Sequence, residues 1–211
     1  MNDIETKVDF IGILKDLGWR PGRDEVGDRN VERRLGDIVI HALVGRRSTR
    51  YAGNPSGVLI LGLSPWVTTD ALSAAYTLMV SPKKRVSDPC IIDQSGSFVI
   101  ELPVIKREDV VAHSDAVIAW AKSCDIGAGL KALRDLPTNS IGAMPARHLA
   151  ALAEAGDVET LTRYRDSFAA GDRAGFTCNY ITEDYIARAL DFAQHRRADR
   201  NWLPKRPRLR V

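Results

Sequence analysis

The first apolar residues of the chain repeat at the spacing of one helix face. Their intervals of four and three predict a helix near the N-terminus. Asn2, with Glu5 three residues later, has the form of a capping box. Residues 18–22 end this helix because they contain glycines and a proline. Residues 22–36 are rich in charge and glycine, which predicts a loop. The apolar stripe consists of Ile4, Val8, Ile11, Leu14 and Leu17.

Two segments further along the chain alternate in the manner of β-strands. Residues 37–44 and 57–64 are largely apolar on both sides, which is typical of central strands. The polar residues 46–56 lie between them. We interpret the three segments as a wide hairpin.

The stretch 88–105 is the part around which the rest of the pattern is organised. Two apolar runs, 90–92 and 97–104, flank the sequence Asp93-Gln94-Ser95-Gly96, in which Asp and Gly favour a tight turn. This arrangement predicts a β-hairpin. Pro103 gives no N–H to a ladder and indicates an edge or a strand end.

Helices are predicted before and after this hairpin. The first begins at Thr68 or Thr69 and extends to about Val80, and the second begins at Glu108 and extends to about Ser123. Residues 1–125 therefore predict an α+β fold, with an antiparallel sheet of about four to five strands flanked by helices.

The later part of the chain has no strand pattern. We interpret residues 126–197 as a helical extension packed on the first domain, followed by a basic tail, residues 198–211. The helices predicted in the extension cover residues 127–136, 145–155, 157–170 and 182–197.

Composition restricts the setting in which the protein acts. No run of about 18 apolar residues occurs, so no membrane-spanning helix is expected. The polar N-terminus lacks the features of a secretory signal. The cysteines, Cys90, Cys124 and Cys178, are odd in number and far apart, which indicates reduced thiols and a cytoplasmic location.

Charge is divided unevenly along the chain. The net charge is +3, but residues 196–211 alone carry seven basic groups and one acid, so the remaining residues are mildly acidic. Pro204 and Pro207 favour an extended backbone in the tail. The tail has three interpretations. It is a solvated end without a role, an arm that contacts phosphates, or a peptide signal that an acidic partner recognises. Its candidate partner-binding residues are Trp202, Lys205, Arg206, Arg208 and Arg210.

Motifs for catalysis are missing from the sequence. Gly127-Ala128-Gly129 resembles the start of a dinucleotide fingerprint, but it lacks the third glycine and follows a predicted helix. The sequence has no P-loop, no nucleophile elbow and no local pair of metal ligands. We therefore expect no enzymatic activity, no cofactor and no catalytic, cofactor-binding or metal-binding residues. A pocket that joins His41, His113 or Cys124 to acidic side chains would contradict this expectation.

The element order resembles a known fold. Helix, strand pair, helix, strand pair and helix in residues 1–125 is similar to the fold of type III secretion chaperones and YbjN-like proteins. The predicted helix at 4–17 and the turn at 93–96 carry this resemblance, which has no diagnostic motif. Type III chaperones are usually shorter, more acidic and without a helical extension. The resemblance implies a chaperone-like first domain that binds another protein, often as a dimer.

These observations lead to two functional hypotheses. The first is a non-enzymatic protein-binding module in a bacterial cytosol, namely a secretion chaperone, an adaptor or an immunity-type partner. Its contact surface would be exposed apolar positions on the sheet or the first helix. The alternative is a translocated effector or a nucleic-acid-associated protein that uses the tail. For translocation, the ending Arg206-Pro207-Arg208-Leu209-Arg210-Val211 is similar to the arginine-rich C-terminal signals of type IV secretion substrates. Those signals also contain an upstream arginine, and here Arg197 stands one residue away from its place.

Overall fold

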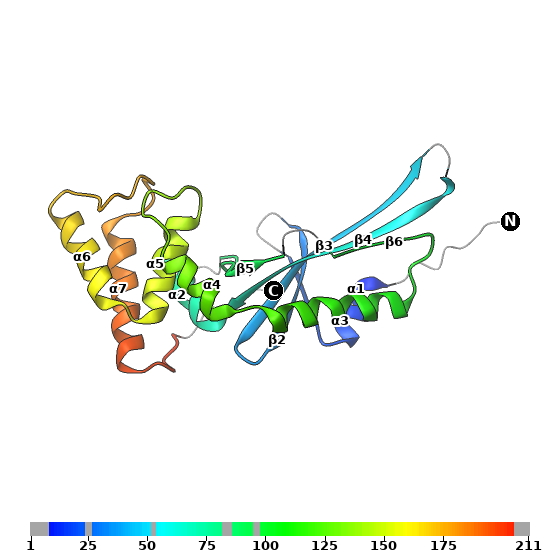
Figure 1. The fold of residues 1–211 in the computed structure, drawn as a ribbon, viewed down its shortest axis with the longest axis horizontal. Helices are drawn as coiled ribbons and strands as arrows, with labels where there is room; N and C mark the ends of the chain where they lie inside the picture. Colours follow the sequence, from blue (N-terminus) through cyan, green and yellow to red (C-terminus); the bar gives the residue numbers. More distant parts are fainter. Residues whose placement is uncertain (1–8, 24–26, 52–53, 82–85, 95–97, 205–211) are drawn as a thin grey trace. The chain divides into compact units, whose positions relative to one another are not determined.

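The chain folds into two compact units in the computed structural model (Figure 1). The model describes residues 9–23, 27–51, 54–81, 86–94 and 98–204, with the backbone alone for 46–60. The sheet unit comprises Met1–Val67 and Ile92–Cys124. The helical unit comprises Thr68–Ile91 and Asp125–Val211.

The described residues form seven helices and a six-stranded antiparallel sheet, which confirms the predicted α+β fold. The strand order is β1-β2-β3-β4-β5, and β6 also pairs with β4. The strands are β1 (Arg20–Arg23), β2 (Arg29–Leu35), β3 (Ile38–Tyr51), β4 (Asn54–Thr69), β5 (Ile92–Asp93) and β6 (Phe98–Leu102). The helices are α1 (Phe10–Asp16), α2 (Asp70–Val80), α3 (Arg107–Ser123), α4 (Ile126–Arg134), α5 (Met144–Ala155), α6 (Val158–Ala169) and α7 (Glu183–Ala198).

Most helices begin where a side-chain oxygen accepts a bond from a free amide of the first turn. Thr69, one of the two caps predicted for α2, accepts from the amide of Leu72. The cap of α1 is Asp9, which accepts from Gly12. The predicted capping box at Asn2 and Glu5 lies outside the described residues. The stripe predicted for the first helix is partly wrong: Leu14 is buried, but Ile11 and Leu17 are only partly buried, and Phe10 and Ile13 are buried in their place. Ile4 and Val8 of that stripe lie outside the described residues.

The loop predicted at residues 22–36 is wrong. Residues 20–23 and 29–35 are strands that pair antiparallel, with Arg20 opposite Glu32 and Arg23 opposite Arg29. The sequence carries almost no apolar alternation here because β1 is exposed along its length and only Val31 of β2 is buried. The hairpin is therefore held by its ladder and by the pairing of β2 with β3.

The hairpin predicted at 88–105 is also wrong. Its two strand segments are present as β5 and β6, but neither pairs with the other. Both run antiparallel along the same edge of β4, with Val67 opposite Ile92 and Leu63 opposite Phe98. Two apolar runs around a turn sequence describe local conformation and leave the choice of partner strand open. Pro103 follows the end of β6, as predicted.

The central strands are longer than the sequence pattern predicts. β3 and β4 extend through residues 46–51 and 54–56, which were predicted as a polar connection. Strands with polar residues on both faces do not show the apolar alternation used to find them. β3 lies between β2 and β4, in agreement with its predicted central position.

Helices α1 and α3 of the sheet unit pack on its strands and on each other (Figure 1). α3 contacts β6 and α1, and the buried residues of α3 include Val110, Val117 and Ala121. Trp19, just after α1, donates its indole N–H to the Ser114 hydroxyl of α3 at 2.8 Å. This buried bond fixes the position of α1 along α3.

The helical unit packs around α5, which contacts α2, α4, α6 and α7. Its core includes Leu72, Met79, Leu149 and Phe192. Arg188 of α7 donates from Nε and Nη2 to the Met79 carbonyl at the end of α2, at 3.0 and 2.7 Å.

The compact units therefore divide the chain differently from the predicted domains. Residues 68–91 were expected in the first domain, and they group with the later helices because the apolar face of α2 is buried there. Among the described residues we find no helix with the length and apolar character needed to cross a bilayer.

We expect Trp19→Phe to reduce the free energy of unfolding by about 1–2 kcal/mol, because it removes the buried bond to Ser114 and leaves that hydroxyl without its partner. Urea unfolding followed by circular dichroism measures the change. Trp120→Phe is the matched control, since Trp120 lies on α3 and is only half-buried. Equal effects of the two substitutions would show that the bond to Ser114 does not hold α1 and α3 together.

We expect the helical unit to lose stability as the pH falls below about 6.5, the ordinary pKa of histidine. Burial lowers the pKa of His148, so the folded state binds fewer protons there than the unfolded chain and is disfavoured in acid. The His148 ring bonds the Leu133 carbonyl and the Tyr164 hydroxyl. Melting temperatures between about pH 7.5 and about pH 5.5 should fall less in His148→Gln than in the wild type. An equal fall would assign the pH dependence to other groups.

Candidate functional site

Most of the predicted partner-binding residues of the basic tail lie outside the described part of the chain. Lys205, Arg206, Arg208 and Arg210 lie outside the described residues. Trp202 is described, and its ring packs on α7 at 5.2 Å from Phe192 and 4.4 Å from His195, measured between ring centroids. One face of Trp202 is therefore occupied by its own chain, and its part in partner binding stays a prediction.

The histidines occupy different environments. His148 is satisfied at both ring nitrogens within the core of the helical unit. His113 of α3 packs edge-on against Phe98 of β6, and burial lowers its pKa. His41 of β3 is stacked on Trp66 of β4, with centroids 5.2 Å apart.

The stacking of His41 on Trp66 identifies one face of the sheet. Side chains alternate along a strand, so Leu43 and Gly45 lie on the same face as His41, and Gly62 lies on the same face as Trp66. Val99 of β6 is directly opposite Gly62 and shares this face. We call it the outer face.

Helix α3 covers the opposite side of the sheet. Phe98, which contacts His113 of α3, is opposite Leu63 in the β4–β6 ladder, and Leu63 is buried. On the outer face, Val99 is 50% exposed and Leu43 is 38% exposed. The sheet unit thus presents Leu43 and Val99 on the face opposite α3, whereas His41 on the same face is buried.

Two glycines make the outer face flat. A Cβ placed on Gly45 would be 3.9 Å from the Gly62 carbonyl oxygen, so the two residues are neighbours on β3 and β4. The nearest side-chain atom to a Cβ on Gly62 would be a methyl of Val99 at 4.0 Å. Glycine within a strand often marks a place where another backbone or a ligand approaches closely. Leu43, Gly45, Gly62 and Val99 form our candidate interaction surface.

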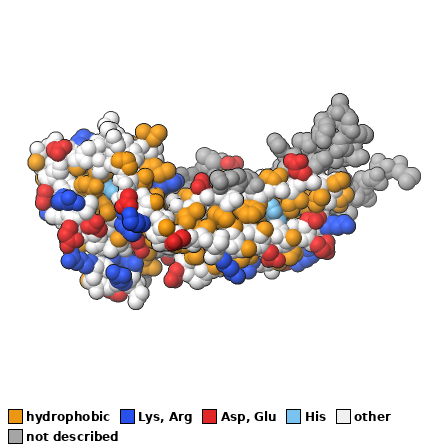
Figure 2. All heavy atoms as spheres, in the orientation of Figure 1, with side chains coloured by type: hydrophobic (Ala, Val, Ile, Leu, Met, Phe, Trp, Pro, Cys, Tyr) orange, Lys and Arg blue, Asp and Glu red, His pale blue; other side chains and the backbone are white. Residues whose placement is uncertain are grey.

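Further apolar side chains are exposed on the same unit. Val104, which follows β6, is 61% exposed. Figure 2 shows hydrophobic side chains gathered in a band along α3, which covers the side of the sheet opposite the outer face, with charged side chains at the margins of the band. Exposed apolar area of this kind is typical of surfaces that contact another macromolecule.

Sequence reasoning did not find the candidate interaction surface. Gly45 and Gly62 were both inside or beside predicted strands, and a glycine in a strand is itself a signal of close approach. Their proximity depends on the pairing of β3 with β4, and their alignment with Val99 depends on β6 joining β4. The wrong hairpin at 88–105 would have kept Val99 away from Gly62.

We expect Gly62→Ala to leave the fold intact and to raise the free energy of unfolding by up to about 1 kcal/mol, since glycine in a strand costs backbone entropy. The added Cβ meets its nearest atoms only at 4.0 Å. Gly156→Ala is the comparison, because Gly156 has φ of +73° and a Cβ on it would lie 3.3 Å from the backbone nitrogen of Arg197. Chemical denaturation should show a loss of about 1 kcal/mol or more for Gly156→Ala. A similar loss for Gly62→Ala would contradict an open surface at this position.

A family model matches most of the chain. No curated protein and no solved structure matches the chain. The model of a family described as a family of unknown function (DUF6990) matches residues 6–194, which include parts of both units and end before the basic tail. The chain therefore belongs to the DUF6990 family.

Proposed function

We propose that this protein is a non-enzymatic protein-binding module, an adaptor, chaperone or immunity-type partner that holds an extended segment of another polypeptide on its outer face. The observation that carries the proposal is the pair of adjacent glycines bordered by exposed Leu43 and Val99. Apolar side chains of the partner would pack on Leu43 and Val99. Its backbone or an aromatic ring would approach the bare strands at Gly45 and Gly62.

The position of β6 supports an extended partner. β6 pairs with β4 and with no other strand among the described residues, so it forms an edge of the sheet. An edge strand offers backbone groups to an added strand, while pockets for alternate side chains give selectivity. Val99 and Glu101 point to the outer face along this edge and are both exposed.

Two further features are consistent with the proposal. The three cysteines form no disulfide bond among the described residues and are half-buried, as expected for a protein of a reducing bacterial cytosol. The order of α1, four strands, α2, two strand segments and α3 keeps the alternation of helices and antiparallel strands on which the resemblance to secretion chaperones rests. The β1–β2 hairpin is an addition to the predicted order.

Site-specific photocrosslinking in the native host tests this function. A benzophenone amino acid at position 43 or 99 should give a discrete adduct whose partner peptide is identified by mass spectrometry. The same amino acid at Asp115, an exposed position on α3, is the control for labelling of any exposed site. With the partner identified, Val99→Asp and the double variant Gly45→Ala/Gly62→Ala should weaken its binding at least tenfold, because each alters the contact surface.

Three results would contradict the proposal. Adducts at Asp115 as abundant as those at 43 and 99 would mean that capture is non-specific. A fourth crosslinker position is Ile141, an 83% exposed residue of the helical unit. Adducts found only at this position would place the interaction on the helical unit. An adduct consisting of two copies of this chain would show that the outer face is a dimer contact.

A further inference from the structure

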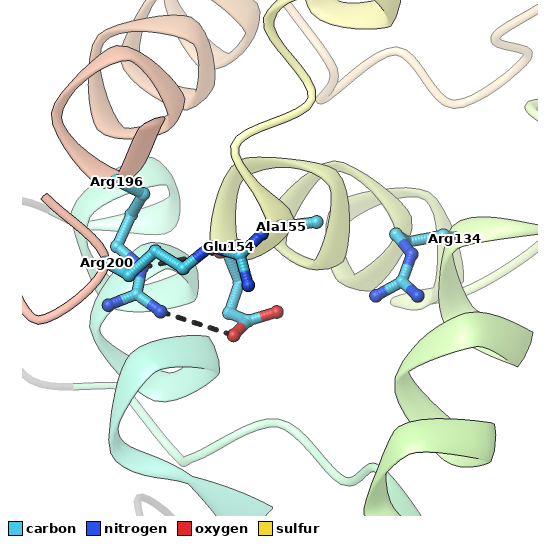
Figure 3. A pocket seen from close by; sticks show the side chains of 5 residues that line it. All are labelled: Arg134, Glu154, Ala155, Arg196 and Arg200. Carbon is cyan, nitrogen blue, oxygen red and sulfur yellow. Dashed lines mark hydrogen bonds and ion pairs between the residues drawn. The ribbon is translucent and has the colours of Figure 1, made fainter. Parts of the chain in front are cut away.

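The helical unit contains a cavity of about 340 Å³ lined by arginines (Figure 3). Its lining comes from the ends of three helices and the segment after α7. Figure 3 shows the Glu154 carboxylate between Arg134 on one side and Arg196 and Arg200 on the other. The lining residues are Arg134, Glu154, Ala155, Arg196 and Arg200.

One arginine in this cavity has a structural role. Arg196 forms an ion pair with Glu154, Nη2 to Oε1 at 3.5 Å, with both side chains less than a fifth exposed. Its Nε donates to the Glu154 carbonyl, and its Nη1 donates to the Trp202 carbonyl. Arg196 and Glu154 therefore neutralise each other and join α5, α7 and the segment that follows α7.

The other two arginines keep their charge. Arg134 and Arg200 form no ion pair with the described residues, although acids lie near them in the sequence. Each of those acids has another partner: Asp135 pairs with Lys131, and Asp199 accepts from the amide of Asn201. The hydrogen bond from Lys131, together with the charges of Lys131 and Arg134, lowers the pKa of Asp135. The cavity thus has two guanidinium groups that form no direct ion pair with the described residues.

Attraction to the C-terminal ends of nearby helices is a structural explanation for these arginines. The hydrogen bonds at the end of α5 make this explanation incomplete. The C-terminus of a helix attracts cations through its free carbonyls. At the end of α5, however, the amide of Gly156 already bonds the Leu152 and Ala153 carbonyls, and Arg196 bonds the Glu154 carbonyl. Arg134 and Arg200 are not needed for those carbonyls, although the dipole of α4 favours a cation at Arg134, which lies in the last turn of that helix.

We infer that this cavity binds a small phosphate ester that also carries a hydroxyl group, with Arg134 and Arg200 holding the phosphate and Glu154 accepting a hydrogen bond from the hydroxyl. Guanidinium groups match the oxygens of phosphate in geometry and charge. Glu154 uses Oε1 for Arg196, and its second oxygen stays available for a donor.

The size and charge of the cavity favour a small ester over a nucleic acid. A volume of about 340 Å³ is in the range of small-molecule sites. A carboxylate in the lining repels a continuous run of phosphates and accepts a hydroxyl. The site lies in the helical unit, and it is independent of the function proposed for the outer face.

Isothermal titration of the full chain with glycerol 3-phosphate, inorganic phosphate and a short DNA duplex tests the inference. We expect one site for glycerol 3-phosphate, with weaker binding of inorganic phosphate, which lacks the second contact. Arg134→Gln and Arg200→Gln should each weaken glycerol 3-phosphate binding at least tenfold, the usual effect of losing a charged hydrogen bond. Arg163→Gln, at an exposed arginine of α6 outside the cavity, is the control for net charge and should bind as the wild type does.

The remaining outcomes overturn the inference. Absence of glycerol 3-phosphate binding removes it, as does equal weakening by Arg163→Gln, which would indicate general charge attraction. Equal affinity for inorganic phosphate and glycerol 3-phosphate removes the role of Glu154. Tighter binding of the duplex, lost on replacing Arg134 or Arg200, would make the cavity part of a nucleic-acid surface. Arg200 is exposed, so Arg200→Gln tests the site without a risk to folding.

Discussion

The hydrogen bonds along both edges of β4 are the constraint on which the sheet unit depends. β3 uses one edge, and β5 and β6 share the other. Every other strand reaches the rest of the sheet through β4 or through β3. The register along β4 then decides which residues face α3 and which face outward, because a shift of one residue would exchange the two faces. The candidate interaction surface exists because Val99 is set opposite Gly62 and not opposite Leu61.

Close packing of small side chains has a comparable role in the helical unit. α5 contacts four other helices, and its buried face is rich in alanine, including Ala146, Ala150 and Ala153. Small residues let helix axes approach closely, so several helices can surround one. Alanine side chains have few atoms for dispersion contacts. Large apolar side chains from neighbouring helices, such as Leu72 and Phe192, therefore fill the space around them.

The sequence predicts the helices better than the sheet for a physical reason. Helix ends are marked locally, and Thr69, Glu108 and Pro145 correctly placed the starts of α2, α3 and α5 to within two residues. A strand depends on its partner, which is remote in sequence. The charged hairpin at residues 20–35 was therefore missed, and β5 and β6 were paired with each other in error. The arginine cavity joins residues 134, 154, 196 and 200, and no local pattern connects positions so far apart.

The stacking of Trp202 on His195 has a spectroscopic consequence. The chain has four tryptophans, and Trp202 is the one that belongs to the helical unit. Its emission therefore reports on that unit without a label once the other three are replaced by phenylalanine. The His195 imidazole stacks on the indole with 4.4 Å between the ring centroids, so the emission also changes when this contact is lost. Because Arg196 bonds the Trp202 carbonyl, the same signal is coupled to the wall of the cavity.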